Sequence, residues 1–77
     1  MSGPLTDTER AVLHLEKHRW RNEGTKEAAI RDELGISATR FYQLLNVVID
    51  SLAALAAEPV LVNRVRRLRD ARRRRAG

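Results

Sequence analysis

A polar but uncharged set of side chains recurs at helical spacing near the middle of the chain. Its members are Thr39, Tyr42, Gln43 and Asn46. At this spacing all four lie on one arc of a helix, and each can form hydrogen bonds. Asn and Gln amides pair bidentately with adenine in the major groove of DNA, and a Thr methyl suits a thymine methyl. A merely solvated arc would more often carry Glu and Lys. The pattern therefore predicts a helix that reads bases, with Tyr42 reaching a phosphate or stacking on a sugar.

The residues before this arc predict how the helix is held. Gly35 separates two helical patterns, and a turn of three to four residues is the spacing of a helix-turn-helix unit. Ser37 is placed to cap the second helix, which we expect to run to about Val48 or Asp50. Arg40 flanks the polar arc, so we assign it to a backbone phosphate. The opposite face carries an apolar stripe for the core, formed by Phe41, Leu44, Leu45 and Val48.

A second signal is the charge at the end of the chain. Residues 64–75 hold eight arginines against one aspartate, a charge of +7, whereas the other residues together carry −2. Guanidinium groups fit phosphates and narrow minor grooves, so this arm predicts a polyanionic partner. A solubility tail or the codon bias of a GC-rich genome is the plain alternative. The candidate contacts are Arg64, Arg66, Arg67, Arg69, Arg72, Arg73, Arg74 and Arg75.

The remaining segments give an all-α fold: a three-helix core with helix-turn-helix geometry, a short connecting helix and a basic C-terminal helix. We divide the chain into a disordered lead (1–5), a helix-turn-helix domain (6–58) and an arginine-rich helix and tail (59–77). Thr6 to Glu9 fits a capping box, so helix one is expected to start at Asp7 and run to about Asn22, with Gly24 as its C-terminal cap.

Further signals place the later helices. Thr25 is expected to cap helix two, and Asp50 or Ser51 a short helix through Ala57. Pro59 suits the first position of the last helix, expected to reach about Arg69 and fray beyond it. Trp20 is expected to anchor the core.

Two resemblances rest on these motifs. GISATRFYQLLN, with its Gly-Ile-Ser turn, Arg40 and Gln43, resembles the turn and recognition helix of the promoter-binding C-terminal domain of sigma factors. The span from about residue 15 to 68 resembles a family of small actinobacterial basic proteins of unknown function. The features shared with that family are the Trp, the Gly-Ile-Ser turn, the Tyr-Gln-Leu-Leu-Asn run and a Pro-Val-Leu-Val segment before arginines. The resemblances imply a DNA-binding, nucleoid-associated protein.

Composition narrows the function classes. The 77 residues contain no cysteine, no glycine-rich phosphate loop and no apolar run of membrane length, so we expect neither an enzyme nor a membrane protein. His14 and His18 are four residues apart, but the Glu of a metalloprotease helix is missing and no third ligand group is evident, so we expect no metal. We likewise expect no cofactor and no small-molecule substrate.

The sequence thus predicts a cytoplasmic, nucleoid-located protein that binds double-stranded DNA with modest specificity, as a nucleoid-associated or transcription-regulating protein. Alternatives are an interaction module for RNA polymerase or a sigma factor, and an RNA-binding arginine-rich protein. We also predict a homodimer, because several apolar residues between 47 and 62 exceed what a small core needs. They are Val47, Ile49, Leu52, Leu55, Val60 and Val62. The competing account is a monomer whose last helix folds back over these side chains.

Overall fold

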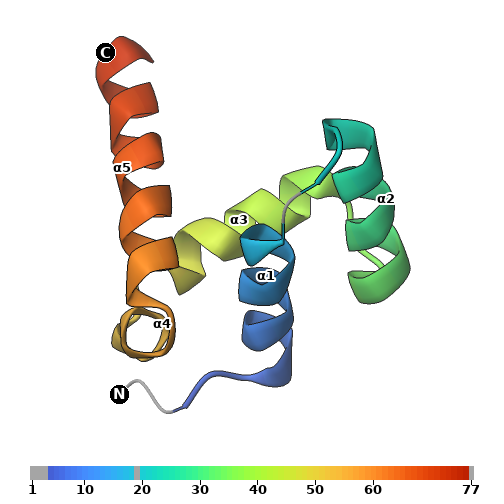
Figure 1. Ribbon diagram of the computed structural model, residues 1–77, viewed down its shortest axis with the longest axis horizontal. Coiled ribbons are helices and arrows are strands. Elements are labelled where there is room, and N and C mark those ends of the chain that lie inside the picture. The colour runs from blue at the N-terminus through green and yellow to red at the C-terminus, as the bar shows by residue number, and fades with distance from the viewer. Residues whose placement is uncertain (1–3, 19, 77) are drawn as a thin grey trace.

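Five helices make up the described part of the computed structural model, which covers residues 4–18 and 20–76 and contains no strand there. The fold is therefore all-α, as predicted. The helices are α1 (Asp7–Lys17), α2 (Glu23–Leu34), α3 (Ala38–Val48), α4 (Leu52–Ala57) and α5 (Pro59–Ala76). In Figure 1, α3 crosses the middle of the molecule, α2 packs near its first residues, and α5 stands steeply at its other end. The molecule measures 33 × 31 × 19 Å.

The first helix begins as predicted and ends earlier than predicted. The Thr6 hydroxyl accepts from the Glu9 N–H, and the Glu9 carboxylate accepts from the Thr6 N–H, which completes the capping box. The helix ends at Lys17 rather than near Asn22. The indole N–H of Trp20 donates to the Leu15 carbonyl at 2.8 Å, which satisfies one of the carbonyls that a helix end leaves without a partner.

The second helix consequently starts earlier than predicted. Asn22, not Thr25, is its N-cap, since the Asn22 side chain accepts from the backbone N–H of Thr25. Gly24 lies in the first turn of α2 and does not cap α1. At the far end, Gly35 closes α2 with a φ of 67°. This left-handed conformation costs a side-chain-bearing residue about 1–2 kcal/mol, so glycine is favoured there.

The third and fourth helices follow the sequence pattern. Ser37 caps α3 and Ser51 caps α4, each accepting from a backbone N–H three residues on. Phe41, Leu45 and Val48 are buried, and Leu44 is half-buried. The connection between α2 and α3 comprises only residues 35–37, and α1 packs against both helices. The core therefore lies where α1, α2 and α3 meet, with α5 added from the side.

The last helix departs from the sequence prediction in two ways. It is helical to Ala76 instead of fraying after Arg69, and arginines near its C-terminus interact favourably with the helix dipole. Its first half is also part of the core, because Leu61, Val62 and Val65 are buried. The helix that carries the arginine-rich segment therefore packs into the core with its first half, and the segment is not a separate appendage.

Packing of this last helix removes part of the predicted dimer surface. Ile49 and Val62 are both fully buried within one chain, and Leu55 is half-buried. Three residues of the predicted patch stay exposed, namely Val47 (70%), Leu52 (73%) and Val60 (80%). In the predicted lead, Leu5 is half-buried and packs against the core, whereas residues 1–3 lie outside the described part of the chain.

Candidate nucleic-acid interface

The polar arc of α3 is largely open to solvent. Thr39, Gln43 and Asn46 are exposed, as is Arg40 at the flank. The Arg40 guanidinium donates to the Gln43 side-chain oxygen at 3.3 Å, a long bond between exposed groups that a stronger partner can replace. Ser37 lies at the start of this surface, where its hydroxyl accepts from the Arg40 N–H and caps the helix. The arc therefore presents an amide on each of two successive turns.

Tyr42 is positioned differently from the rest of the predicted arc. Its side chain is half-buried, and its hydroxyl donates to Glu23 of α2 at 3.1 Å. Its ring stands edge-on to Phe41, with 5.2 Å between ring centroids. Partial burial raises the pKa of Tyr42, so the phenol stays neutral at physiological pH. A phosphate contact by Tyr42, as predicted, would require the bond to Glu23 to break.

Behind Tyr42 lies an ion pair that the sequence analysis did not identify. Lys26 of α2 is buried, and its ammonium donates to Glu16 of α1 at 2.7 Å while lying 4.9 Å from the centroid of the Tyr42 ring. Burial, the largest single effect, would by itself lower the pKa of Lys26, but Glu16 and Tyr42 together outweigh burial and raise the pKa. Lys26 shares a helical face with Ile30, a spacing that marks it as inward-facing. The pair ties α1 and α2 together beneath α3.

The exposed face of α3 also includes an apolar side chain. Val47 lies four residues after Gln43, on the same side of the helix, and is 70% exposed. Val47 belongs to the predicted dimer surface, but its place beside Gln43 also suits apolar contact with a thymine methyl. Its spacing from Arg40 and Gln43 was the signal available in the sequence.

The arginines of α5 fall into two groups. Arg66 and Arg69 contact the end of α3: the Arg66 Nε donates to the Ile49 carbonyl at 2.7 Å, and Arg69 binds the Asp50 carboxylate. The others are exposed and form no ion pair within the described residues; they are Arg64, Arg67, Arg72, Arg73, Arg74 and Arg75. Six of the eight predicted contacts are thus free to meet a polyanion in this conformation.

A groove of about 380 Å³ joins the two predicted surfaces. Asn46 and Tyr42 of α3 line it together with Arg72 and Arg73 of α5. Glu16, Glu23 and Lys26 also line it, so the groove contains carboxylates from α1 and α2 as well as arginines from α5. Thr39 and Gln43 do not line it. The tertiary structure therefore brings the end of the polar arc beside the arm.

Comparison with known proteins places the chain in a family. A family model described as "Protein of unknown function (DUF3263)" matches residues 4–76. The chain belongs to the DUF3263 family. No curated protein and no solved structure matches it.

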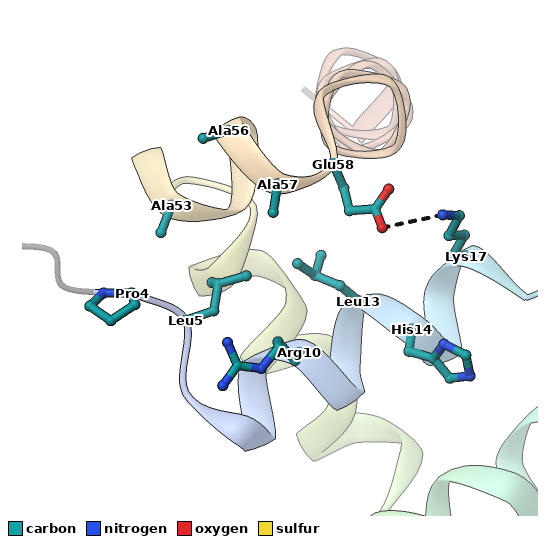
Figure 2. A pocket seen from close by; sticks show the side chains of 10 residues that line it. All are labelled: Pro4, Leu5, Arg10, Leu13, His14, Lys17, Ala53, Ala56, Ala57 and Glu58. Atoms are coloured by element: carbon teal, nitrogen blue, oxygen red, sulfur yellow. Dashed lines mark hydrogen bonds and ion pairs between the residues drawn. The ribbon is translucent and has the colours of Figure 1, made fainter.

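A second cavity in this DUF3263 chain lies away from the arc, between α1, α4 and the residues that lead into α1. Its volume is about 670 Å³. Figure 2 shows Leu5, Leu13 and Ala57 around it, and a hydrogen bond from Lys17 to Glu58 at its edge. The walls are mainly aliphatic, a lining common in sites that bind apolar groups.

The two histidines of the DUF3263 chain lie in different surroundings. His14 lines the apolar cavity, whereas the His18 ring lies 4.5 Å from that of Trp20. Trp20 is half-buried against the core, less enclosed than the anchor that we predicted. Among the described residues no group of three or more His, Cys, Asp or Glu side chains is arranged to hold a metal ion. Within the same residues, no helix is long and apolar enough to cross a membrane.

Proposed function

We propose that this chain binds double-stranded DNA through α2, the 35–37 turn and α3, used as a helix-turn-helix unit, together with the arginines of α5. The observation that carries the proposal is the groove in which Asn46 and the arginines at 72 and 73 lie together. An amide that can read adenine thus sits beside guanidinium groups that can neutralise phosphates. The exposed face of α3 enters the major groove, with Thr39, Gln43 and Asn46 toward the bases.

The arm supplies most of the affinity in this proposal. Each phosphate that an arginine neutralises releases condensed counterions. For every such contact, a tenfold rise in salt concentration lowers the logarithm of the binding constant by about 0.9. Six exposed arginines against three amide or hydroxyl readers favour strong electrostatic binding with modest sequence preference. Such a balance fits a nucleoid-associated or architectural role more closely than that of a single-operator repressor.

The decisive experiment compares two asparagines. Asn46→Ala removes an amide from the groove, whereas Asn63→Ala removes the same amide from the exposed side of α5, outside the groove. Binding of each variant to a selected DNA site and to random duplex is measured by fluorescence anisotropy across a salt series. An RNA duplex and single-stranded RNA serve as competitors.

We expect Asn46→Ala to lose about 1–3 kcal/mol on the selected site and far less on random DNA, with Asn63→Ala unchanged on both. Equal losses on the two DNAs would assign Asn46 to the backbone instead of to bases. Absence of duplex binding at low salt would refute the proposal. Preferential binding to RNA would favour the RNA-binding alternative.

A second candidate function is interaction with RNA polymerase or a sigma factor. The apolar cavity between α1 and α4 favours it, because an aliphatic hollow beside Lys17 can accept an apolar side chain of a partner. Ala53 lines this cavity. Ala53→Arg should abolish co-sedimentation with purified polymerase holoenzyme and leave DNA binding intact. Co-sedimentation that resists this change would exclude the cavity from such an interaction.

A further inference from the structure

The outer half of α5 has few attachments to the rest of the molecule. Its buried apolar residues end at Val65, and Figure 1 shows the following turns rising away from α3. Within the described residues, the hydrogen bonds that join α5 to the end of α3 come from Arg66 and Arg69. The direction of the free arginines beyond residue 71 therefore depends on this short polar junction.

Asp50 is the acidic half of the junction. It lies two residues after the end of α3, and its two carboxylate oxygens accept from the two terminal nitrogens of Arg69 at 3.1 and 3.2 Å. Arg66 Nε is 3.8 Å from the same carboxylate. The two parallel hydrogen bonds fix the orientation of the guanidinium plane relative to the carboxylate as well as their separation, whereas a single hydrogen bond fixes only the separation. The bond from Arg69 holds the pKa of Asp50 below its usual value, so the carboxylate is charged at neutral pH.

We propose that Asp50 is a positioning residue that sets the angle of the α5 arm against α3, and thereby where residues 72–75 meet the phosphates. This inference rests on the proposed DNA-binding function. Asp50 itself need not touch DNA, because it acts through Arg69. The bidentate contact holds the arm in one orientation before DNA arrives, and a pre-organised arm loses less conformational entropy on binding.

The inference predicts an effect opposite in sign to simple electrostatics. A carboxylate close to phosphate-binding arginines repels DNA, and its removal would add one positive unit of net charge. If that unit acts as a further phosphate contact, the counterion slope allows up to about an eightfold gain in affinity at 0.1 M salt. A positioning role instead predicts weaker binding when the charge is removed.

Asp70 provides a matched control on the arm itself. It is also close to Arg69, at 3.6 Å from Nε, and its side chain is 54% exposed compared with 58% for Asp50. Asp70, however, lies on the same helix as Arg69 and cannot fix α5 against α3. Asp50→Asn and Asp70→Asn therefore remove the same charge from neighbouring places, and only the first removes the junction.

The experiment measures affinity of the full chain for duplex DNA and the distance between labels at Ala28→Cys and Arg74→Cys. Both positions are exposed, and the chain has no cysteine of its own. We expect Asp50→Asn to weaken binding at least threefold and to broaden the distance distribution measured by electron paramagnetic resonance. Asp70→Asn should bind as tightly as the parent or more tightly, with an unchanged distribution, and Asp50→Glu should recover part of the affinity.

Two results distinguish a failure of the positioning role from a failure of the proposed DNA-binding function. If Asp50→Asn binds as tightly as Asp70→Asn and keeps a narrow distance distribution, the positioning role is wrong while DNA binding stands. If the parent chain does not bind duplex DNA, the proposed function fails, and the distance distribution alone decides whether Asp50 orients the arm. Circular dichroism of each variant establishes that the helices are retained.

Discussion

Removal of the Lys26 ammonium tests the packing beneath α3 most directly. The change is Lys26→Met, which retains an unbranched apolar stem over the aromatic rings and deletes the charge. The Lys26 side chain is 10% exposed and its partner Glu16 is 17% exposed, so the variant leaves a nearly buried carboxylate without its cation. Loss of one member of a buried pair costs about 3–5 kcal/mol. The remaining exposure of both groups places the expected cost near the lower limit, about 3 kcal/mol.

Such a loss is large for a domain of this size. At about 0.05–0.15 kcal/mol per residue, a chain of 77 residues has a free energy of unfolding of about 4–12 kcal/mol. For a small domain each kcal/mol lowers the melting temperature by about 4–8 °C, so Lys26→Met should lower it by about 12–24 °C. Urea unfolding followed by far-UV circular dichroism gives the free energy directly.

A double variant isolates the cause. Glu16→Leu combined with Lys26→Met removes both charges, so no buried carboxylate remains, and much of the lost stability should return. A loss below about 1 kcal/mol for Lys26→Met alone would show that the pair behaves as a surface salt bridge, contrary to its burial. A double variant as unstable as the sum of its parts would show that the two side chains act independently.

The same pair predicts a dependence on alkaline pH. Folding raises the pKa of Lys26 above its ordinary 10.5, so the folded chain binds this proton more tightly than the unfolded chain. The resulting stability is fully present below that ordinary value and is lost as the pH rises through the folded pKa. Tyr42, also with a raised pKa, acts in the same direction. Stability should therefore fall above about pH 10 in the parent, whereas in the Glu16→Leu/Lys26→Met variant the Lys26 contribution disappears and that of Tyr42 remains.

Three further predictions concern the arm, the turn and assembly. Deletion of residues 72–77 removes four exposed arginines but keeps the contact between Arg69 and Asp50, so the slope of log affinity against log salt concentration should become shallower by about 3.6 units. The control Arg31→Gln on α2 should leave this slope unchanged. An unaltered slope after the deletion would exclude the arm from DNA binding. Gly35→Ala should lower the free energy of unfolding in urea by about 1–2 kcal/mol through backbone conformation alone, since a Cβ there meets nothing within 4 Å. An unchanged free energy of unfolding would contradict the left-handed turn. Because Ile49 and Val62 are buried within one chain, we expect the competing monomer, with a mass near 8.8 kDa in sedimentation equilibrium at micromolar concentration. A mass twice as large, reduced by Leu52→Asp, would instead support the homodimer.

Helix caps and the apolar stripe could be predicted from the sequence, because residues close along the chain determine them. Thr6, Ser37 and Ser51 cap their helices as predicted, because a cap needs only a side-chain oxygen and an N–H three residues later. The stripe from Phe41 to Val48 follows the helical period, so its burial was predictable. The boundary between α1 and α2 was not, because Trp20 and Asn22 compete with helix continuation through hydrogen bonds that helical spacing does not show.

Tertiary structure decided which members of each sequence pattern are available to a partner. The eight arginines of residues 64–75 look alike in sequence, but contacts with Ile49 and Asp50 engage two of them and leave six exposed. Tyr42 resembles the other members of its arc, yet its hydroxyl reaches Glu23, nineteen residues earlier. By sequence, Ile49 and Val62 are among more apolar residues than a small core needs, but the packing of α5 against the body buries both. In each case the partner is distant along the chain, so only the folded packing of the helices determines whether the side chain remains free.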